Sequence, residues 1–419
     1  MQTPRRSWLL VLLLSLVSFM AYFLRTSITV AQEQMVPELG LSFNQMGVIT
    51  GIGFQLAYAL GQIPAGIAGD WYGARRVLGW ALVIFAVATF ATGIVPSAAS
   101  AAAVFSYLLA VRALLGTAQA ATYPVGSMAI AYTLEPHQRA TANGIYIGAA
   151  NLATALVPLT LAPLMVAAGW RAVFRAGGVL ALLLALAWYR WAPDVRPDGP
   201  PPALKSQLAT LVGLLRDRDI FLVSLSYLLH SAVFFVFVFW FFRYLIDERG
   251  MTILASGIYA SVPWFAAFAI APACGWLADR VGKERGGLSG RRRVAMGCML
   301  IGATLMSIGI RTDSQVLAVG ILSIAVGILT GVEGSFWAVT TTFAAGRAGA
   351  AGGVLNLFGN LGGVISIWAV PLMVDRWGWL ITLSSWAGVS VASALLWTLV
   401  REGRKTQGAR REQQLAAGS

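Results

Sequence analysis

Long apolar runs separated by short polar stretches fill almost the whole chain. Twelve of these runs come close to, or exceed, the roughly 20 residues that an α-helix needs to cross a bilayer. Hydrocarbon offers no water to backbone amides, so each run must pair its own amides and is expected to be helical. The pattern therefore predicts an all-α membrane protein with twelve transmembrane helices. These are expected at approximately Trp8–Val30, Asn44–Ala68, Val77–Val95, Ala103–Thr133, Thr141–Ala168, Ala172–Trp191, Ile220–Ile246, Ile253–Ala278, Val294–Ile310, Val316–Val339, Ala350–Val374 and Leu380–Val400.

The longest polar interruption, Ala192–Asp219, separates six expected helices from the other six. Its proline run and its charged residues are typical of a linker, and a short amphipathic helix is expected over Leu204–Leu215. Four parts are therefore expected. They are an N-terminal six-helix bundle (1–191), a cytoplasmic linker (192–219), a C-terminal six-helix bundle (220–400) and a basic cytoplasmic tail (401–419).

One short motif occurs twice, each time directly after an apolar run. Residues 66–76 read GIAGDWYGARR and residues 275–285 read GWLADRVGKER, and both fit G-x-x-x-D-x-x-G followed by basic residues. A duplicated bundle of membrane helices explains this pairing best, and it favours transport over catalysis. The expected fold is two pseudo-symmetric six-helix bundles with a central site between them.

The repeated motif also suggests how such a transporter is gated. Asp70 and Asp279 end their helices, where a carboxylate can pair with loop arginines or with the positive N-terminal end of another helix. Contacts that exist in only one conformation bias an alternating-access equilibrium. A static tight turn is the alternative. The residues expected to control gating are Gly66, Asp70, Gly73, Arg75, Arg76, Asp279, Arg280 and Gly282.

Charge distribution fixes the expected orientation. The chain is 58% hydrophobic and 11% charged, and its net charge of +13 alone would suit a nucleic-acid binder. The arginines instead gather in segments that twelve spans place on one side of the membrane, as at Arg5–Arg6, Arg75–Arg76, Arg291–Arg293 and Arg401–Arg411. This bias marks the cytoplasmic side. Both termini are thus expected in the cytoplasm of a cell with this protein in its inner (plasma) membrane, and no nucleic-acid partner is expected.

No catalytic constellation stands out along the chain. Ser/His/Asp sets, paired carboxylates and metal-spaced His/Cys sets are not evident, so neither an enzyme nor a metal or cofactor is expected. Cys274 and Cys298 fall within expected helices and are interpreted as packing residues.

Arg25 is the most informative charged residue, because it lies well inside the first expected helix. A charge near the middle of a span costs about 2.5–3.5 kcal/mol on insertion scales. Tyr22, Thr29 and Gln32 share its face at helical spacing, which makes a polar stripe. Such a stripe is expected to face a wet cavity where the arginine binds an anion. A structural or interfacial arginine is the alternative.

Two further helices of the first half carry polar stripes. Stripes that face one another suit a central pathway, although hydrogen bonds between helices, worth about 0.6 kcal/mol each, are the alternative. Arg112 and Gln62 are intramembrane candidates for a structural or pathway role. The stripes are Gln55, Tyr58 and Gln62 in the second helix, and Arg112, Gly116, Gln119 and Tyr123 in the fourth.

Fewer polar residues occur in the expected helices of the second half. Glu333 is the acidic residue placed within a helix and away from its ends, and Glu33 lies near the outer end of the first helix. A buried carboxyl group can exchange a proton near neutral pH, so both are candidates for proton coupling. An ion pair or hydrogen bond to a neighbouring helix is the alternative for Glu333. His230 is interpreted as a packed residue rather than a proton relay.

Several segments resemble the major facilitator superfamily. The six-linker-six layout and the duplicated loop match it over nearly the whole length. Within it, residues 24–31 (LRTSITVA) are similar to the L-R-x-x-[LI]-[ST]-V-A signature of the anion:cation symporters, which include carriers of hexuronate, galactonate, phthalate and sialic acid and the vesicular glutamate transporters. Residues 58–66 (YALGQIPAG), 336–337, 343–346 and 356–363 (NLFGNLGG) resemble the second, tenth and eleventh spans of that group.

The resemblance implies that Arg25 holds a substrate carboxylate and that Tyr58 lies in the pocket. One departure concerns the fourth span, where proton-coupled members carry a glutamate in R-x-x-x-G-x-x-E-x-x-x-[YF]-P. Here Gln119 occupies that position, and glutamine cannot titrate. Either Glu333 or Glu33 takes over the role, or the carrier is a uniporter or exchanger. The expected substrate-binding residues are Arg25, Tyr58, Gln119, Tyr123, Trp240, Asn356 and Asn360.

The sequence thus predicts a monomeric secondary transporter that moves a small organic anion by alternating access, with a proton or sodium ion as possible coupling ion. Efflux of amphipathic drugs is the alternative within transport. A transporter-like solute sensor is the alternative of another class, although the short segment after Arg401 leaves little room for a signalling module.

Overall fold

The computed structural model describes residues 4–96, 100–196, 204–285, 287–344 and 347–401, without the side chains of a few residues in these ranges. Every regular element in them is a helix. In the first half the helices are α1 (Pro4–Leu39), α2 (Phe43–Gly47), the π-helical η1 (Val48–Gly53), α3 (Phe54–Tyr72), α4 (Ala74–Thr92), α5 (Ala101–Gln119), α6 (Thr122–Thr133), the 3₁₀ turn η2 (Pro136–Gln138), α7 (Arg139–Ala168) and α8 (Trp170–Trp191).

The second half follows the linker helix α9 (Leu204–Arg216), which forms where the sequence predicts an amphipathic helix. Its helices are α10 (Arg218–Asp247), α11 (Ile253–Tyr259), α12 (Val262–Arg285), α13 (Gly287–Gly309), α14 (Gln315–Gly331), α15 (Glu333–Phe343) and α16 (Ala348–Leu399).

Twelve membrane crossings follow from these helices. Among the described residues, nine helices are long and apolar enough to span a membrane, or ten when α7, bent by 42°, counts as one span. At 1.5 Å per residue the 52 residues of α16 measure about 78 Å, more than twice a hydrocarbon core of about 30 Å. The chain reverses within it at Gly378 (φ 73°, ψ 173°), so α16 holds two spans. The less apolar α13, whose first turns carry Arg291–Arg293, completes the set.

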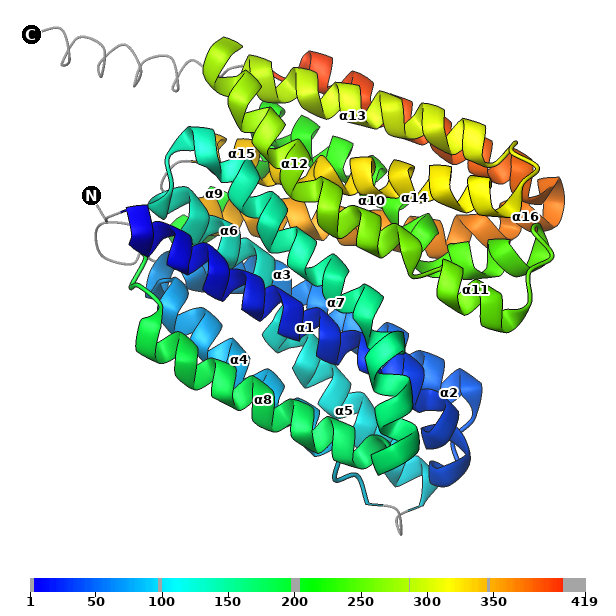
Figure 1. The fold of residues 1–419 in the computed structure, drawn as a ribbon. Coiled ribbons are helices and arrows are strands. Elements are labelled where there is room, and N and C mark those ends of the chain that lie inside the picture. Colours follow the sequence, from blue (N-terminus) through cyan, green and yellow to red (C-terminus); the bar gives the residue numbers. More distant parts are fainter. Residues whose placement is uncertain (1–3, 97–99, 197–203, 286, 345–346, 402–419) are drawn as a thin grey trace, which may run out of the picture.

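The two halves form neighbouring bundles, with α1–α8 on one side and α10–α16 on the other (Figure 1). They meet mainly where α3 packs on α16 and where α7 packs on α12, here called the two seams. A methyl group on Gly66 would lie 2.2 Å from the carbonyl oxygen of Gly349, and one on Gly275 would lie 2.5 Å from that of Ala140. The first glycine of each repeated motif thus lets backbones touch across a seam.

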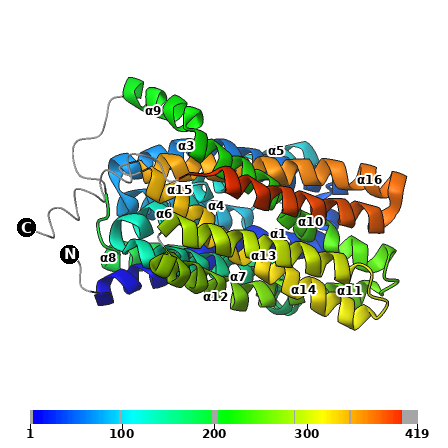
Figure 2. The same cartoon turned by 90° about the horizontal axis from the view of Figure 1, so that it is seen from above.

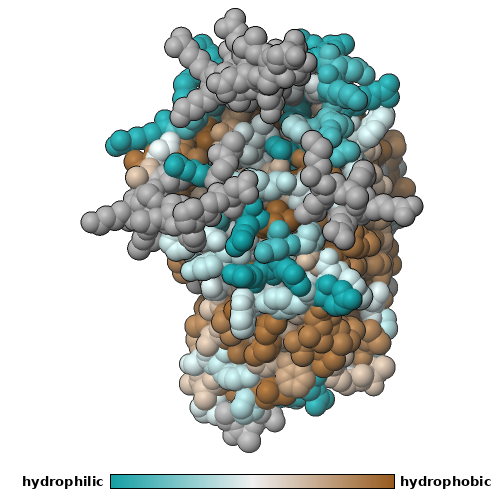
Figure 3. Space-filling view, turned by 90° about the vertical axis from the view of Figure 1, so that its left-hand side faces the viewer, coloured by the Kyte–Doolittle hydropathy of each residue, from teal (hydrophilic) through white to brown (hydrophobic). Residues whose placement is uncertain are grey.

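The two ends of the bundle differ. The linker end, where α9 and the start of α1 lie, carries the repeated motifs, and Figure 2 shows the reversal of α16 at the opposite, far end. Hydrophilic residues gather over the face that includes the linker end, and hydrophobic residues cover its flanks (Figure 3). This is the surface that a bilayer-spanning protein requires, because its flanks contact lipid. Cys274 and Cys298 are buried free thiols.

Four crossings are interrupted, which hydropathy does not predict. The second consists of α2, η1 and α3, and the eighth of α11 and α12. In the fourth, α5 gives way to α6 at Ala120–Ala121, and in the tenth, α14 gives way to α15 at Val332. The fourth and tenth crossings occupy equivalent places in the two halves, so the two breaks are related by the repeat.

Candidate functional site

A cavity of about 560 Å³, counted with the space at its mouth, lies between the two halves. Both halves contribute to its walls. Its polar lining consists of Tyr22, Arg25, Tyr58, Tyr123, Asn151, Tyr227, Ser231, Glu333, Asn356 and Asn360.

Arg25 presents its guanidinium group from α1 to this cavity. One Nη2–H donates to Oε1 of Gln55 at 2.7 Å. The rings of Phe54, Tyr58 and Tyr22 surround the group, with centroids 4.5, 5.1 and 5.4 Å from Cζ. Cation–π contacts of this kind contribute roughly 0.5–2 kcal/mol each. No ion pair joins Arg25 to an acidic residue within the described part of the chain, so its charge remains available.

Arg112 supports Arg25 from behind and does not line the cavity. It is 1% exposed, and its Nη2 donates to the backbone oxygen of Arg25 at 3.1 Å. Its Nε and Nη1 have no hydrogen-bond partner among the described residues. Two guanidinium groups therefore lie close together in the first half, which makes this wall electropositive.

The two fourth-span candidates separate in the structure. Tyr123 lines the cavity, and its hydroxyl lies 3.3 Å from Oγ of Ser18. Gln119 is not among the lining residues. Its Nε2 donates to the backbone oxygen of Ala21 at 3.0 Å, so it joins α5 to α1.

The opposite wall comes from α16, whose two asparagines bind α3 directly. Nδ2 of Asn356 donates to Oε1 of Gln62 at 2.8 Å and to the hydroxyl of Tyr58 at 3.4 Å. Oδ1 of Asn360 accepts from Nε2 of Gln55 at 2.6 Å. The structure thus brings Arg25, Tyr58 and the two asparagines together.

Glu333 is the first residue of α15 and lies at the break of the tenth crossing. It lines the cavity and has no ion pair or hydrogen bond to another described side chain. His230 does not line the cavity. It is 1% exposed, packs against Tyr227 and Phe336, and neither ring nitrogen has a described partner. Glu33 lies in α1, but its side chain is outside the part that the structure describes.

Trp240 is not where the sequence analysis expects it. The residues of α10 that line the cavity are Tyr227, Ser231, Phe234 and Phe235. Trp240 lies five residues beyond Phe235, about 7.5 Å farther along the helix, and packs in an apolar cluster. The sequence analysis overlooked Tyr227, Ser231 and Asn151. The i, i+4 spacing of Tyr227 and Ser231 in an apolar run is the signal that would have found the first two.

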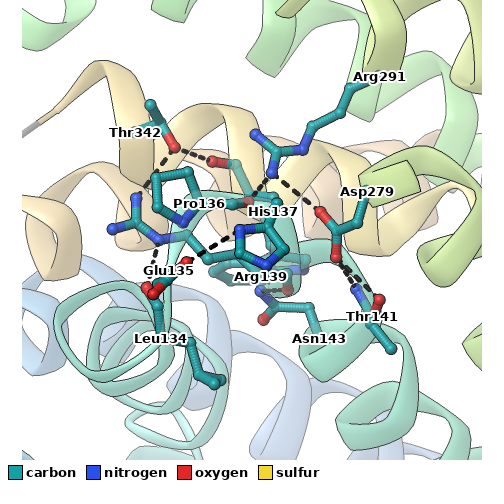
Figure 4. Close-up of polar contacts among 12 residues, drawn as sticks. Leu134, Glu135, Pro136, His137, Arg139, Thr141, Asn143, Asp279, Arg291 and Thr342 are labelled. Carbon is teal, nitrogen blue, oxygen red and sulfur yellow. Dashed lines mark hydrogen bonds and ion pairs between the residues drawn. The ribbon is translucent and has the colours of Figure 1, made fainter. Parts of the chain in front are cut away.

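The repeated motifs bind the two halves together at the linker end. Oδ1 and Oδ2 of Asp70 accept from the backbone amides of Gly349 and Ala350, at 2.9 and 2.8 Å, in the first turn of α16. Asp279 accepts from the amide and hydroxyl of Thr141 in the first turn of α7, at 2.7 and 2.9 Å (Figure 4). Each motif carboxylate thus meets a helix N-terminus of the other half, where negative charge is favourable.

Arginines strengthen the second of these contacts. Nη2 of Arg291 donates to Oδ1 of Asp279 at 2.9 Å and also to the backbone oxygen of Pro136. Nη1 of Arg139 donates to Oγ1 of Thr342 at 3.2 Å across the same interface (Figure 4). The buried ion pair is 3–5% exposed, so solvent screens it little.

The arginines and the later glycines of the motifs stay within their own half. Arg75 donates to the backbone oxygen of Tyr189, and Arg76 is exposed. Arg280 pairs with Glu284 at 3.3 Å on the surface. Gly73 has φ 80°, a conformation that favours glycine, and Gly282 is buried at the turn before α13. The motif side chains that hydrogen-bond across are therefore those of the two aspartates, beside the backbone contacts at Gly66 and Gly275.

The comparison with protein families identifies the scaffold. Residues 14–367 match the Major Facilitator Superfamily. The chain belongs to this superfamily. Its members are transporters, not enzymes, and this multi-pass chain is a transporter of that type.

Among curated relatives of this superfamily transporter, the probable galactarate/D-glucarate transporter GudP of Escherichia coli is 27% identical and is covered to 94%, over 96% of this chain. The hexuronate transporter of Bacillus subtilis is 24% identical, with 88% of each chain covered. The probable sulfoacetate transporter SauU of Cupriavidus necator is 28% identical, over 87% of this chain and 86% of the relative. The resemblance to sugar-acid carriers that the motifs suggest is confirmed.

Solved structures support the fold of this superfamily transporter. FucP in the outward conformation has a TM-score of 0.74 at 15% identity, covering 94% of this chain and 99% of FucP. The proton:xylose symporter XylE has a TM-score of 0.72 at 15% identity, covering 96% and 97%. The predicted fold of two six-helix bundles is thereby confirmed.

Proposed function

We propose that the protein is a secondary transporter that moves a small organic anion, with a sugar acid as the best candidate, across the bacterial inner membrane by alternating access. The observation that carries the proposal is Arg25, a guanidinium group that faces a cavity between the halves without an acidic partner among the described residues. A buried charge is costly unless it is paired. A carboxylate that enters the cavity provides the pair.

The charges around the cavity favour an anionic cargo. Arg25 and Arg112 contribute two positive charges to one wall, and Glu333 is the acidic residue in the cavity lining. An amphipathic cation meets repulsion from Arg25 in this site, which disfavours the drug-efflux alternative. Guanidinium groups also bind carboxylates through two parallel hydrogen bonds, which adds geometric specificity.

The remaining polar lining suits a hydroxylated anion. Asn151, Ser231, Asn356 and Asn360 offer amide and hydroxyl groups around a space next to Trp337. Sugar hydroxyls both donate and accept hydrogen bonds, so such groups can bind them in either sense. Relatives named as transporters of galactarate, D-glucarate and hexuronate support a sugar acid over an aromatic acid.

Alternating access is supported by where the halves touch. Among the described residues, the direct hydrogen bonds between the halves lie at the cavity walls or at the linker end. We infer that the linker end is closed and cytoplasmic, as the expected positive-inside bias requires. Residues 1–191 and 220–400 then act as the two bundles that rock about the cavity, with residues 192–219 as a cytoplasmic linker.

We further propose that Glu333 couples transport to protons. Gln119 lacks a titratable group and does not line the cavity, whereas Glu333 does. A carboxyl group at the rim of the substrate site can respond to both the cargo and the proton. Sodium coupling and uncoupled exchange are the competing outcomes of the test described in the Discussion.

Uptake by purified protein in proteoliposomes tests the function. Wild-type protein should take up at least one of D-galactonate, D-glucarate or D-glucuronate, and Arg25→Leu should lower the affinity about 10-fold or more, the effect of losing a hydrogen bond to a charged group. Arg243→Leu, which removes an exposed arginine of α10 that pairs with Asp247, is the matched control and should behave as wild type. Equal uptake by Arg25→Leu would refute the assignment, and Arg25-independent transport of amphipathic cations would favour efflux.

A further inference from the structure

A continuous chain of hydrogen bonds links the cationic wall to the opposite half. Arg25 donates to Oε1 of Gln55 at 2.7 Å, and Nε2 of Gln55 donates to Oδ1 of Asn360 at 2.6 Å. Asn360 in turn donates through Nδ2 to the backbone oxygen of Asn356 at 2.8 Å. The hydrogen bond from Gln55 to Asn360 is the one that connects α3 to α16.

The direction of this chain is fixed by chemistry. A guanidinium group only donates hydrogen bonds, so the oxygen of Gln55 must face Arg25. The amide nitrogen of Gln55 must then face Asn360, whose oxygen accepts and whose nitrogen is left to donate to Asn356. A single orientation of both amide groups satisfies every partner.

Gln55 lies between two cavity residues and far from the linker end, and this position suggests a role for the hydrogen-bond network. Gln55 does not line the cavity itself, but Arg25 and Asn360 both do. It lies 15 residues from Asp70, about 22 Å farther along α3 from the linker end. Among the described residues of α3 that bond to the other half, Gln55 is the farthest from that end. It therefore lies on the side of the cavity that faces away from the closed linker end.

We propose that Gln55 is a positioning residue that transmits carboxylate binding at Arg25 to Asn360 on the other half. Its oxygen holds the guanidinium group so that the remaining N–H groups face the cavity. Its nitrogen holds Asn360, so the residue that binds the charge and a residue that contacts the rest of the cargo move together. This inference rests on the proposed function. Without Gln55 the anion still binds Arg25, but its binding no longer promotes the movement of one half relative to the other.

The variant Gln55→Met separates this role from others, because it keeps the side-chain length and removes both hydrogen bonds. The turnover number should fall at least about 10-fold, since one lost bond involves a charged group. The dissociation constant for the best sugar acid, measured by isothermal titration, should change less than about 3-fold. The matched control is Gln34→Met, because Gln34 donates to the backbone oxygen of Met165, a contact within the first half. It should leave both constants unchanged.

A second variant keeps the inference testable if Gln55→Met folds poorly. Gln55→Glu has the same shape but places a carboxylate against Arg25, which competes with the cargo. It should weaken binding about 10-fold or more. Combining Gln55→Met with Asn360→Leu should lower turnover no further than the more damaging single variant, since residues that act through each other are not additive.

Each other outcome overturns the inference. A larger dissociation constant with normal turnover in Gln55→Met would make Gln55 a direct substrate ligand. Lower thermal stability with normal kinetics would make it a simple link between helices, and unaltered binding in Gln55→Glu would remove its contact with Arg25 from the working carrier. If wild-type protein binds no organic anion, the proposed function fails. If Arg25→Leu abolishes binding while the Gln55 variants behave as wild type, this inference alone fails.

Discussion

The contact between Gly66 and Gly349 allows a quantitative test of the closed linker end. A methyl group added at Gly66 would lie 2.2 Å from the oxygen and 2.7 Å from the carbonyl carbon of Gly349. Both are backbone atoms, so no side chain can move aside. An ordinary carbon–oxygen contact requires about 1 Å more, and overpacking of this kind costs typically 1–3 kcal/mol. Gly66→Ala must therefore push α3 away from α16.

That displacement also weakens a neighbouring contact. Asp70, one turn along α3, accepts from the amides of Gly349 and Ala350 at 2.9 and 2.8 Å, and 1 Å of separation takes both beyond hydrogen-bond range. A hydrogen bond to a charged group contributes about 1.5–3 kcal/mol. At the lower value, loss of the two hydrogen bonds together removes about 3 kcal/mol from the linker-end-closed state. This shifts the equilibrium toward a linker-end-open state on the order of 100-fold.

Labelling of a single cysteine measures this shift. Ser231→Cys, in a background with Cys274 and Cys298 replaced by serine, places a thiol on the cavity wall. Adding Gly66→Ala should reduce its reaction with a membrane-impermeant maleimide from the far side and increase it from the linker side. Gly297→Ala is the matched control, because an added methyl group there meets no atom within 4 Å. Identical labelling of Gly66→Ala and wild type would refute the reasoning.

Two further predictions concern single acidic residues. Asp279→Leu should lower the free energy of unfolding by about 3–5 kcal/mol, because it removes one partner of the buried Asp279–Arg291 ion pair, whereas Glu284→Gln, which breaks the exposed pair with Arg280, should cost less than about 1 kcal/mol. Thermal unfolding in detergent compares the two, and equal losses would contradict the importance of burial. Glu333→Gln should abolish the dependence of net uptake on a pH gradient while exchange of internal for external cargo continues. A pH dependence that survives would exclude Glu333 as the proton site and favour sodium or uncoupled transport.

Features that depend on local pattern could be predicted from the sequence. Hydropathy located the crossings because a bilayer selects for length and apolarity residue by residue. The motif repeat placed Asp70 near the end of its helix, although α12 continues past Asp279 to Arg285, and helical spacing placed Arg25 in a polar stripe. In each case the evidence lies within about one helix, so no knowledge of tertiary packing is needed.

Features that depend on packing could not be predicted. Hydropathy does not fix how far a helix extends along the cavity, and Trp240 accordingly lies beyond it. Gln119 donates to the backbone of α1, whereas Tyr123, four residues later, lines the cavity, and helical spacing alone does not separate these two roles. Which helix N-terminus each motif aspartate meets is also a property of the assembled halves.

The crossed pairing of Asp70 and Asp279 has an evolutionary consequence. Each half supplies a carboxylate at the end of its second crossing and receives one at the first turn of its fifth, α7 or α16. An ancestral protein of six helices would already have carried both features. Two such molecules, side by side, could have formed both aspartate contacts with helix N-termini at once. A tandem gene fusion would then have kept an interface that already existed.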